Sequence, residues 1–402
     1  MWLKLFSIGN WTRSIGDDAM DRDCVFDSWL ASGFLPSEWL IPLLYQMNSS
    51  HEIYESVVVR KENHPELIPE KYRARLLAGA SKDIMQKYDK LTDSLGIRSL
   101  TIMDEDYPEK LRNLSDPPGI LFYLGDVSCI SRSRSVSMVG SRSASYAGLK
   151  ASRKIAGDLS RYGIVIVSGF AYGIDTECHW GCLEGGSPTI AVIGCGPDQN
   201  YPAGNEKLKS SILDQHGLIL SEYPPGTKPL GNHFPYRNRI ISALSDAVIL
   251  MEAKIRSGSM TTIAHALKQG KDVFAYPGDP SSPFSEANRI ILREGARYFT
   301  TANDILEDMN WLDNQSYVGH NNRCSASSEP EDSNERVVYN ALLKGSLGFD
   351  ELVQATGMNP SELLSVLTIM QIKKRIEPLP GKRYNLLSAN PTEKEYPANG
   401  ER

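Results

Sequence analysis

The sequence predicts an α/β fold built on a doubly wound, mostly parallel β-sheet. Six short apolar runs between residues 135 and 309 are mostly unbroken by charge, which is typical of strands buried on both faces. Segments with helical spacing separate these runs, so a unit of strand, loop and helix repeats along the chain. The predicted strands are 135–139, 164–168, 189–194, 218–221, 247–252 and 272–277.

Helices are predicted between these strands, at 146–162, 175–184, 205–216 and 259–269. A further strand at 120–125 follows a series of proline and glycine turns. Residues 1–95 show helical spacing without glycine-rich loops, and they predict a small helical domain. The sheet domain is therefore expected to span 96–311.

The C-terminal part predicts a linker and a third domain. Residues 312–334 are polar and predict a flexible linker. Three helices, at 335–343, 349–356 and 360–372, precede a hairpin that turns at Pro380-Gly381, and this is the winged-helix arrangement. The winged-helix domain is expected over 335–387 and a disordered tail over 388–402. The third helix has no Lys or Arg, so we expect a protein contact or an auxiliary phosphate contact rather than major-groove reading.

Charge and composition narrow the classes of function. The 402 residues include 43 Lys and Arg against 49 Asp and Glu, so any anion site must come from local clustering. No run approaches the roughly 18 to 20 apolar residues of a membrane span, and the first residues lack a signal peptide's apolar centre. The six cysteines form no CxxC pair, which favours reduced thiols over disulfides or zinc. We expect a cytoplasmic protein with no membrane span.

Two loops after predicted strands have the composition of phosphate sites, and ligands of doubly wound sheets bind beyond the carboxyl ends of the strands. The first strand is followed by Gly140, Ser141 and Arg142, which combine close backbone approach, helix N–H groups and a guanidinium. A tight turn with a surface arginine is the alternative interpretation. The second strand ends in Ser168 and Gly169, ahead of another helix start.

The segment 233–239 is the densest cluster of arginines and rings, and we expect it to be a loop. Arginines neutralise phosphates and rings stack on exposed bases. In the alternative interpretation, the phenylalanine lies in the core, the tyrosine lies on the surface and the arginines form salt bridges. Glu222 and Asp246 flank the segment in the sequence, and we expect them to orient its guanidiniums in a supporting role. A third loop follows strand 247–252 and again offers cations and serines at a helix start. The candidate residues of these two segments are Phe234, Arg237, Asn238, Arg239, Lys254, Arg256, Ser257, Gly258 and Ser259.

Signals for catalysis are weak. His179, His233 and His265 fall near these loops, but no nucleophile or carboxylate pair accompanies them at a recognisable spacing. Neither GxGxxG nor GxxxxGK[ST] is present, which disfavours common NAD and ATP sites. We expect a binding protein without a cofactor, rather than an enzyme.

Taken together, the motifs resemble the DNA-processing protein A family (DprA, also called Smf). The resemblance rests on MVGSRSASYAG, VSGFAYGIDTECHWGCLEGGSPTIAVIGCGPDQNYP, LSEYPPG, HFPYRNRIISALSDAVILMEAKIRSGSMTT and DVFAYPGDP, in family order. It implies an extended Rossmann-like domain that binds single-stranded DNA without sequence preference. It also implies a homodimer that loads a RecA-type recombinase during natural transformation and recombination.

The family's DNA-binding positions match this sequence residue by residue. Its phosphate-binding arginine matches Arg142, and its FPxRNR segment matches Phe234, Pro235, Arg237, Asn238 and Arg239. Ser168 and Gly169 match its second-strand loop, and Arg256 to Ser259 match its RSGS loop. The sequence departs from the family at 285–288, where Ser-Glu-Ala-Asn replaces the usual Ser-x-Gly-x-Asn.

A nucleotide-processing enzyme is the alternative function. Nucleoside-monophosphate phosphoribohydrolases share a related sheet, but their PGGxGTxxE signature is missing. The corresponding segment reads SGSMTTIAHA, without a glutamate at the catalytic position.

Overall fold

The computed structural model describes residues 19–132, 134–279, 282–312, 333–343, 346–373, 375–379 and 383–386. The chain divides into two compact units, Met1–Gly319 and His320–Arg402, and each is described by itself. Most of the predicted linker, the hairpin turn at Pro380-Gly381 and the predicted tail lie outside the described residues. No helix in the described ranges is long and apolar enough to cross a membrane.

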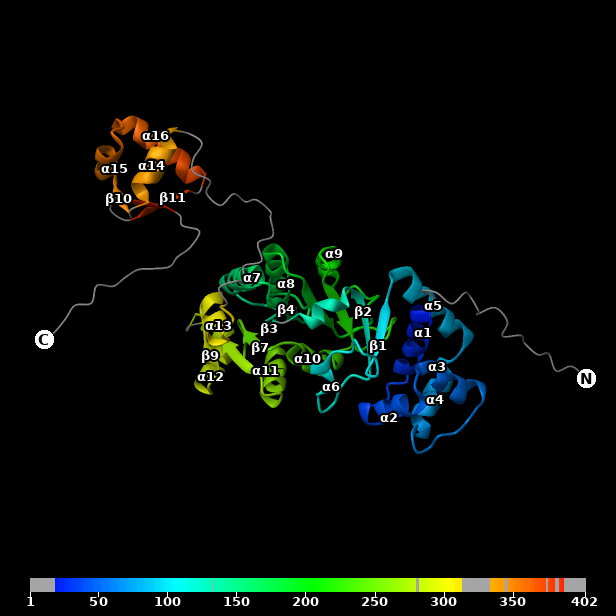
Figure 1. Ribbon diagram of the computed structural model, residues 1–402. Coiled ribbons are helices and arrows are strands. Elements are labelled where there is room, and N and C mark those ends of the chain that lie inside the picture. Colours follow the sequence, from blue (N-terminus) through cyan, green and yellow to red (C-terminus); the bar gives the residue numbers. More distant parts are fainter. Residues whose placement is uncertain are drawn as a thin grey trace, which may run out of the picture. The chain divides into compact units, whose positions relative to one another are not determined.

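The first unit is built on one nine-stranded sheet with the order β1-β2-β6-β5-β4-β3-β7-β8-β9 (Figure 1). Neighbouring strands from β6 to β9 run parallel, whereas β2 is antiparallel to both β1 and β6. The doubly wound, mostly parallel fold class is therefore confirmed. The strands are β1 (Arg98–Thr101), β2 (Ile120–Gly125), β3 (Ser135–Val139), β4 (Val165–Ser168), β5 (Thr189–Ile193), β6 (Leu218–Ser221), β7 (Ala247–Leu250), β8 (Asp272–Ala275) and β9 (Arg297–Tyr298).

Every strand predicted from the apolar runs is present. Residues such as Val136, Ile166 and Ile249 are fully buried, since this sheet has helices on both faces. The strands β1 and β9 were not predicted, because edge strands of four and two residues are too short to show a hydrophobic pattern.

Helices cover both faces of the sheet (Figure 1). The helices α7, α8 and α13 pack on one face around Val136, Met138 and Phe274. The helices α10, α11 and α12 pack on the other face, in a core that continues into the N-terminal helices. The bounds are α6 (Glu109–Arg112), α7 (Tyr146–Arg161), α8 (Ile174–Gly185), α9 (Glu206–Asp214), α10 (His233–Leu244), α11 (Ser259–Lys268), α12 (Glu286–Arg293) and α13 (Ala302–Asp308), with 3₁₀ turns η2 (Val127–Ser131), η3 (Ala203–Asn205) and η4 (Pro283–Ser285).

The described part of the N-terminal region is helical, as its spacing predicts. Trp29 is fully buried there, and its indole N–H donates to the carbonyl of Leu76 at 2.9 Å. The helices share one hydrophobic core with the sheet, so this layer packs directly against β1 and β2. The elements are α1 (Ala19–Ser32), α2 (Ser37–Met47), α3 (Ser50–Tyr54), the π-helical turn η1 (Glu55–Val59), α4 (Glu70–Gly79) and α5 (Lys82–Leu95).

The sequence predicted a loop at 233–239, and this prediction is wrong. The segment forms the first two turns of α10. Pro235 is compatible with this position because the N–H groups of a helix's first turn have no partner within the helix. The helix places successive side chains on different sides of its axis. This separation gives its two arginines different surroundings.

The second unit has the winged-helix arrangement that the sequence predicts. Three helices enclose a core of Val338, Leu352, Leu363, Leu367 and Met370 beside a small antiparallel sheet. The elements are α14 (Ser333–Leu342), β10 (Leu347–Gly348), α15 (Phe349–Thr356), α16 (Pro360–Ile372), β11 (Ile376–Leu379) and β12 (Arg383–Leu386).

Candidate nucleic-acid interface

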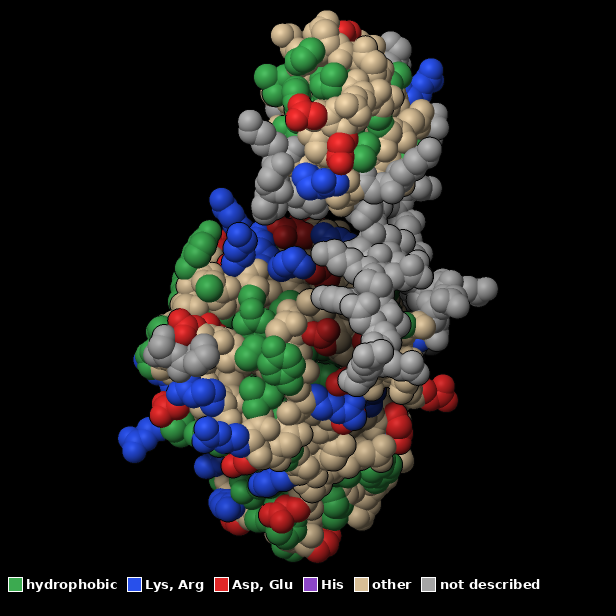
Figure 2. All heavy atoms as spheres, turned by 90° about the vertical axis from the view of Figure 1, so that its left-hand side faces the viewer, with side chains coloured by type: hydrophobic (Ala, Val, Ile, Leu, Met, Phe, Trp, Pro, Cys, Tyr) green, Lys and Arg blue, Asp and Glu red, His purple; other side chains and the backbone are tan. Residues whose placement is uncertain are grey.

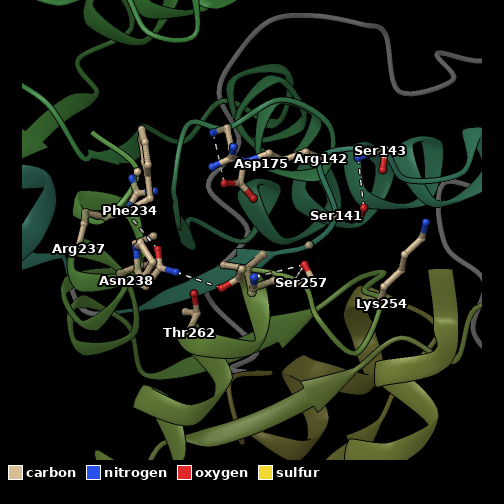
Figure 3. A pocket seen from close by; sticks show the side chains of 18 of the residues that line it. Ser141, Arg142, Ser143, Asp175, Phe234, Arg237, Asn238, Lys254, Ser257 and Thr262 are labelled. Atoms are coloured by element: carbon tan, nitrogen blue, oxygen red, sulfur yellow. Dashed lines mark hydrogen bonds between the residues drawn. The ribbon is translucent and has the colours of Figure 1, made fainter. Parts of the chain in front are cut away.

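A cavity of about 620 Å³ opens where the strands of the central sheet end (Figure 3). Its walls come from the loops after β3, β4 and β7 and from the first turns of α10. The chain winds outward in opposite directions from β3 and β7, so the cavity lies at the topological switch point of the sheet. We call this space the main cavity.

The loop after β3 presents Arg142 to the main cavity. Gly140 is required there, because a Cβ atom would lie 2.6 Å from the side chain of Ile174 at the start of α8. The N–H of Ser141 donates to the carbonyl of Glu252 at 2.7 Å, which fixes the loop against β7. The Arg142 guanidinium is exposed, lies 5.4 Å from the centroid of the Phe234 ring, and pairs with no carboxylate of the described residues. It is available to an anion.

The loop after β4 lies deeper. The hydroxyl of Ser168 donates to the carbonyl of Met138 at 2.6 Å, and Ser168 is buried beneath the cavity rather than lining it. Gly169 has no room for a side chain, because a Cβ would lie 2.7 Å from Oδ2 of Asp175 and 3.0 Å from Nη2 of Arg237. This loop therefore acts as a backbone support for the charged groups around it.

Arg237 is buried at the base of the main cavity. Its Nη1 donates to the carbonyl of Gly169 at 2.9 Å and also to the carbonyl of Val192, so α10 is tied to the loop after β4 and to strand β5. Burial lowers the pKa of Arg237 to about 10, which leaves it charged at neutral pH. Its guanidinium lies 6.0 Å from the centroid of the Phe234 ring.

Asp175 brings a buried carboxyl group to the same cavity. Burial raises its pKa to about 6, and the nearby charges of Arg237 and Arg142 partly oppose that rise. The next turn of α8 carries His179, whose pKa burial lowers to about 3, so this histidine is neutral. Its Nδ1 pairs with the hydroxyl of Thr189 at 2.7 Å.

Asn238 and the loop after β7 close the other side of the main cavity. The Asn238 amide donates to the hydroxyl of Thr261 at 2.7 Å and to the carbonyl of Gly258 at 3.2 Å, which fixes the start of α11. Ser257 and Ser259 share a hydrogen bond of 2.7 Å. Lys254 and Arg256 are exposed, and Lys254 lies 4.8 Å from the centroid of the Phe284 ring.

The segment 285–288 is held in place by Asn288. Asn288 is fully buried and donates to the carbonyls of Leu250, Met251 and Tyr276 at 2.8 to 3.1 Å. Its side-chain oxygen accepts from the N–H of Ala253 at 3.0 Å. One side chain thus joins the segments that follow β7 and β8, next to Lys254.

Arg239 lies outside the main cavity. It forms a bidentate ion pair with Glu222, at 2.9 and 2.6 Å, and the Tyr236 ring centroid lies 4.0 Å from its guanidinium carbon. The expectation that Glu222 orients an arginine of this segment is confirmed. The same expectation for Asp246 is wrong, because its carboxylate pairs with Lys110 and with the N–H of Ser135.

Two wall residues were not singled out as binding positions from the sequence. Asp175 stands in the segment after β4, near the start of α8, and its carboxyl lines the main cavity. Tyr201 lies far along the chain, and its ring centroid is 5.5 Å from that of Phe234. The signal that could have found Tyr201 is its place in the segment that follows a strand end, after Gly194.

The charge of the main cavity is locally positive. Four cations line it, Arg142, Arg237, Lys254 and Arg256, and Asp175 is the one carboxylate among the described lining residues. Elsewhere the charges are mixed, and Figure 2 shows Lys and Arg interspersed with Asp and Glu over one face of the larger unit. The structure therefore places a positive site on a chain with a formal net charge of −6.

No group of three or more metal-ligating side chains occurs among the residues the structure describes. The five described cysteines are buried, and burial raises the pKa of Cys182 and Cys195 to about 11. These thiols pack as small apolar groups.

Two family models match the chain. The model for DNA recombination-mediator protein A matches residues 98–310, and the DprA winged-helix domain matches 324–382. The DNA processing protein DprA of Streptococcus pneumoniae is 44% identical over 210 residues, which cover 52% of this chain and 73% of that protein. The DprA of Bacillus subtilis is 38% identical over 244 residues, covering 59% of this chain and 82% of that protein.

The fold is similar as well. The X-ray structure of DNA processing protein A from Streptococcus pneumoniae matches with a TM-score of 0.58 at 31% identity, covering 74% of this chain and 99% of that one. The sheet that carries the main cavity lies within the segment that the first family model matches. The chain belongs to the DNA recombination-mediator protein A (DprA/Smf) family.

Proposed function

We propose that the chain binds single-stranded DNA without sequence preference, with its phosphates in the main cavity. The observation that carries this proposal is the ring of exposed cations, Arg142, Lys254 and Arg256, around a cavity that also contains the half-buried ring of Phe234. Cations neutralise phosphates and a ring stacks on a base of any identity. Stacking on Phe234 requires an unpaired base, which favours a single strand over a duplex.

The predicted site residues take different proposed roles. Arg142, Lys254 and Arg256 contact phosphates, Phe234 stacks on a base, and Asn238 holds the α11 start. Residues at the two helix starts offer backbone N–H groups and hydroxyls to phosphate oxygens, namely Gly140, Ser141, Ser257, Gly258 and Ser259. Ser168, Gly169, Arg237 and Arg239 support the site from buried positions.

We infer from family membership that this binding serves DNA recombination, through the loading of a RecA-type recombinase on incoming DNA during natural transformation. The chain would act as a non-enzymatic mediator in the cytoplasm, without a cofactor.

A homodimer is also part of the proposal. The sheet ends in the short edge strand β9, where Tyr298 is 61% exposed, and Ile290 on the preceding helix α12 is 38% exposed. Exposed apolar groups beside an unpaired strand edge suit contact with a second copy. Analytical ultracentrifugation of the wild type and of Tyr298→Asp tests this, with a monomeric variant expected.

Fluorescence anisotropy with a labelled mixed-sequence single strand and its duplex, at several salt concentrations, tests DNA binding. We expect salt-sensitive binding to the single strand and weaker binding to the duplex. If neither DNA binds at low salt, the proposal is wrong. Release of free base from a nucleoside monophosphate would instead favour the phosphoribohydrolase alternative.

A further inference from the structure

A second, smaller pocket of about 270 Å³ lies between the N-terminal helices and the edge of the sheet. We call it the outer pocket. Its walls are mainly apolar or aromatic, with Phe34, Leu40, Ile120, Tyr223 and Tyr236 among them. Such a pocket suits a flat, uncharged group.

The polar groups of the outer pocket are already paired. Glu222 is held by Arg239 in the bidentate ion pair, and the hydroxyl of Ser37 donates to Asp116. The described lining contains no lysine or arginine. The outer pocket therefore offers no counter-charge to a phosphate.

The outer pocket lies beside the main cavity. Pro235 lines the main cavity and the next residue, Tyr236, lines the outer pocket, so consecutive residues in the first turn of α10 border the two spaces. Both spaces lie at the same edge of the sheet, since Tyr223 and Pro224 follow the carboxyl end of β6. The start of α10 is therefore the route by which a strand bound in the main cavity would extend to the outer pocket.

Phe34 stands at the rim in an unusual backbone conformation. Its φ is +50°, in the left-handed region that disfavours residues with a Cβ, and its side chain is 49% exposed. A glycine would suit this turn between α1 and α2 better, and the exposed ring gains little from packing. Strain of this kind is found where a side chain has a function.

Tyr236 also lines the outer pocket, and its ring is held in place. Its hydroxyl donates to Asp116 at 2.7 Å and one of its contacts is the Arg239 guanidinium, yet the residue stays 41% exposed. A ring that is held in place before binding loses little conformational freedom when a base stacks on it.

We propose that the outer pocket binds an unpaired base of the same DNA strand whose phosphates lie in the main cavity, with Phe34 and Tyr236 as its aromatic walls. The inference rests on the proposed function. It extends the DNA path from the sheet to the N-terminal helices. An apolar side chain of another protein is the competing occupant, and the test separates the two.

The test uses the full chain with Phe34→Gly, which removes the ring and suits the left-handed backbone. Phe34→Tyr keeps a ring, and Tyr45→Ala is the matched control, because Tyr45 is 55% exposed on α2 outside the outer pocket. Affinities are measured by anisotropy for thymidine oligomers of about four and about twelve nucleotides, a range typical of single-strand sites. Thermal unfolding of each variant checks its fold.

We expect Phe34→Gly to bind the longer oligomer about tenfold more weakly, as for the loss of one stacked base. Its affinity for the short oligomer and its salt slope should not change, because a base carries no counterions. Phe34→Tyr should restore binding, and Tyr45→Ala should match the wild type.

Other outcomes overturn the inference. If Phe34→Gly and the wild type bind both oligomers with equal affinity, and binding stays salt-sensitive, then no base binds in the outer pocket. The proposed function is not affected by that result. If the same variant keeps DNA binding and loses recombinase loading, a protein occupies the outer pocket. If the wild type binds neither oligomer, the proposed function itself fails.

Discussion

Arg237 donates a 2.9 Å hydrogen bond from Nη1 to the carbonyl of Gly169, and this contact joins α10 to the loop after β4. The same guanidinium also reaches the carbonyl of Val192 and lies near the buried carboxyl of Asp175. Several buried groups thus depend on one planar cation. A lysine in its place has no fork with which to reach them.

Replacing Arg237 with lysine should therefore destabilise the protein. We expect the free energy of unfolding to fall by roughly 3 kcal/mol, since a lysine keeps the charge but has no fork with which to donate to both buried carbonyls. Urea denaturation followed by circular dichroism measures this. Arg142→Ala is the control, because Arg142 is exposed, and its free energy of unfolding should stay within about 0.5 kcal/mol of the wild type. Equal stability of Arg237→Lys and Arg142→Ala would contradict the buried role of Arg237.

Arg142→Ala should instead change the salt dependence of DNA binding. The slope of log affinity against log salt should become shallower by about 0.7, the value for one phosphate contact on a single strand. Anisotropy titrations over a series of salt concentrations measure it. Arg161→Ala is a matched control. Arg161 lies at the C-terminal end of α7, whereas the N-terminal end of that helix lies at the main cavity. A slope equal to that of the wild type would remove Arg142 from the phosphate contacts.

The sheet and its loops could be predicted from the sequence, and the roles of the arginines could not. The strands are contiguous apolar runs, so each shows its own signal, and the loops of a doubly wound sheet meet at one edge. The guanidiniums of Arg142, Arg237 and Arg239 look equivalent in a sequence. In the structure, Arg142 is exposed, Arg237 donates to buried carbonyls and Arg239 pairs with Glu222.

The outer pocket could not be predicted from the sequence either. Phe34 and Tyr236 lie about half the chain apart, and although Tyr236 stands in the candidate segment 233–239, nothing in the sequence links it to Phe34. Only the packing of the N-terminal helices against the sheet brings them together. The prediction of a loop at 233–239 failed for a related reason, because proline and arginine there are equally compatible with the first turns of a helix.

Asp175 should make DNA binding sensitive to pH. Its pKa is raised to about 6 by burial, and Arg237, Arg142 and neutral His179 are the ionisable groups around it. As pH rises through about 6, the carboxylate forms beside the proposed phosphates, so affinity should fall. If DNA binding raises the pKa of Asp175 by one further unit, the affinity at pH values well below about 6 should be about tenfold higher than the affinity well above it. Anisotropy between about pH 5 and 8 measures the effect.

The titration of Asp175 should also change the free energy of unfolding with pH, in a direction set by its raised pKa. The pKa of Asp175 in the folded protein lies above its ordinary value of 3.8, so its contribution to the free energy of unfolding is full below that value and is lost as pH rises through about 6. Asp175→Asn should remove this loss and flatten both pH profiles. Asp158→Asn, on the exposed side of α7, is the control and should keep the wild-type profiles. Profiles that stay pH-dependent in Asp175→Asn would assign the titration to another group.

Asn288 should control the placement of the cationic loop after β7. Its side chain donates to three carbonyls and accepts from the N–H of Ala253, the residue before Lys254. Asn288→Ala removes these hydrogen bonds and leaves the buried N–H of Ala253 without this acceptor, so we expect the free energy of unfolding to fall by roughly 3 kcal/mol. The variant should also bind DNA more weakly, because Lys254 and Arg256 lose a fixed position. Urea denaturation and anisotropy measure the two effects.

Asn113→Ala is the control for this prediction, since Asn113 is exposed and bonds only to Glu109 through its side chain in the described structure. It should change the free energy of unfolding by less than about 0.5 kcal/mol. Loss of stability in Asn288→Ala with full DNA affinity would show that the loop keeps its position without the asparagine. Loss of both would show that one buried amide holds the loop that carries two of the proposed phosphate contacts.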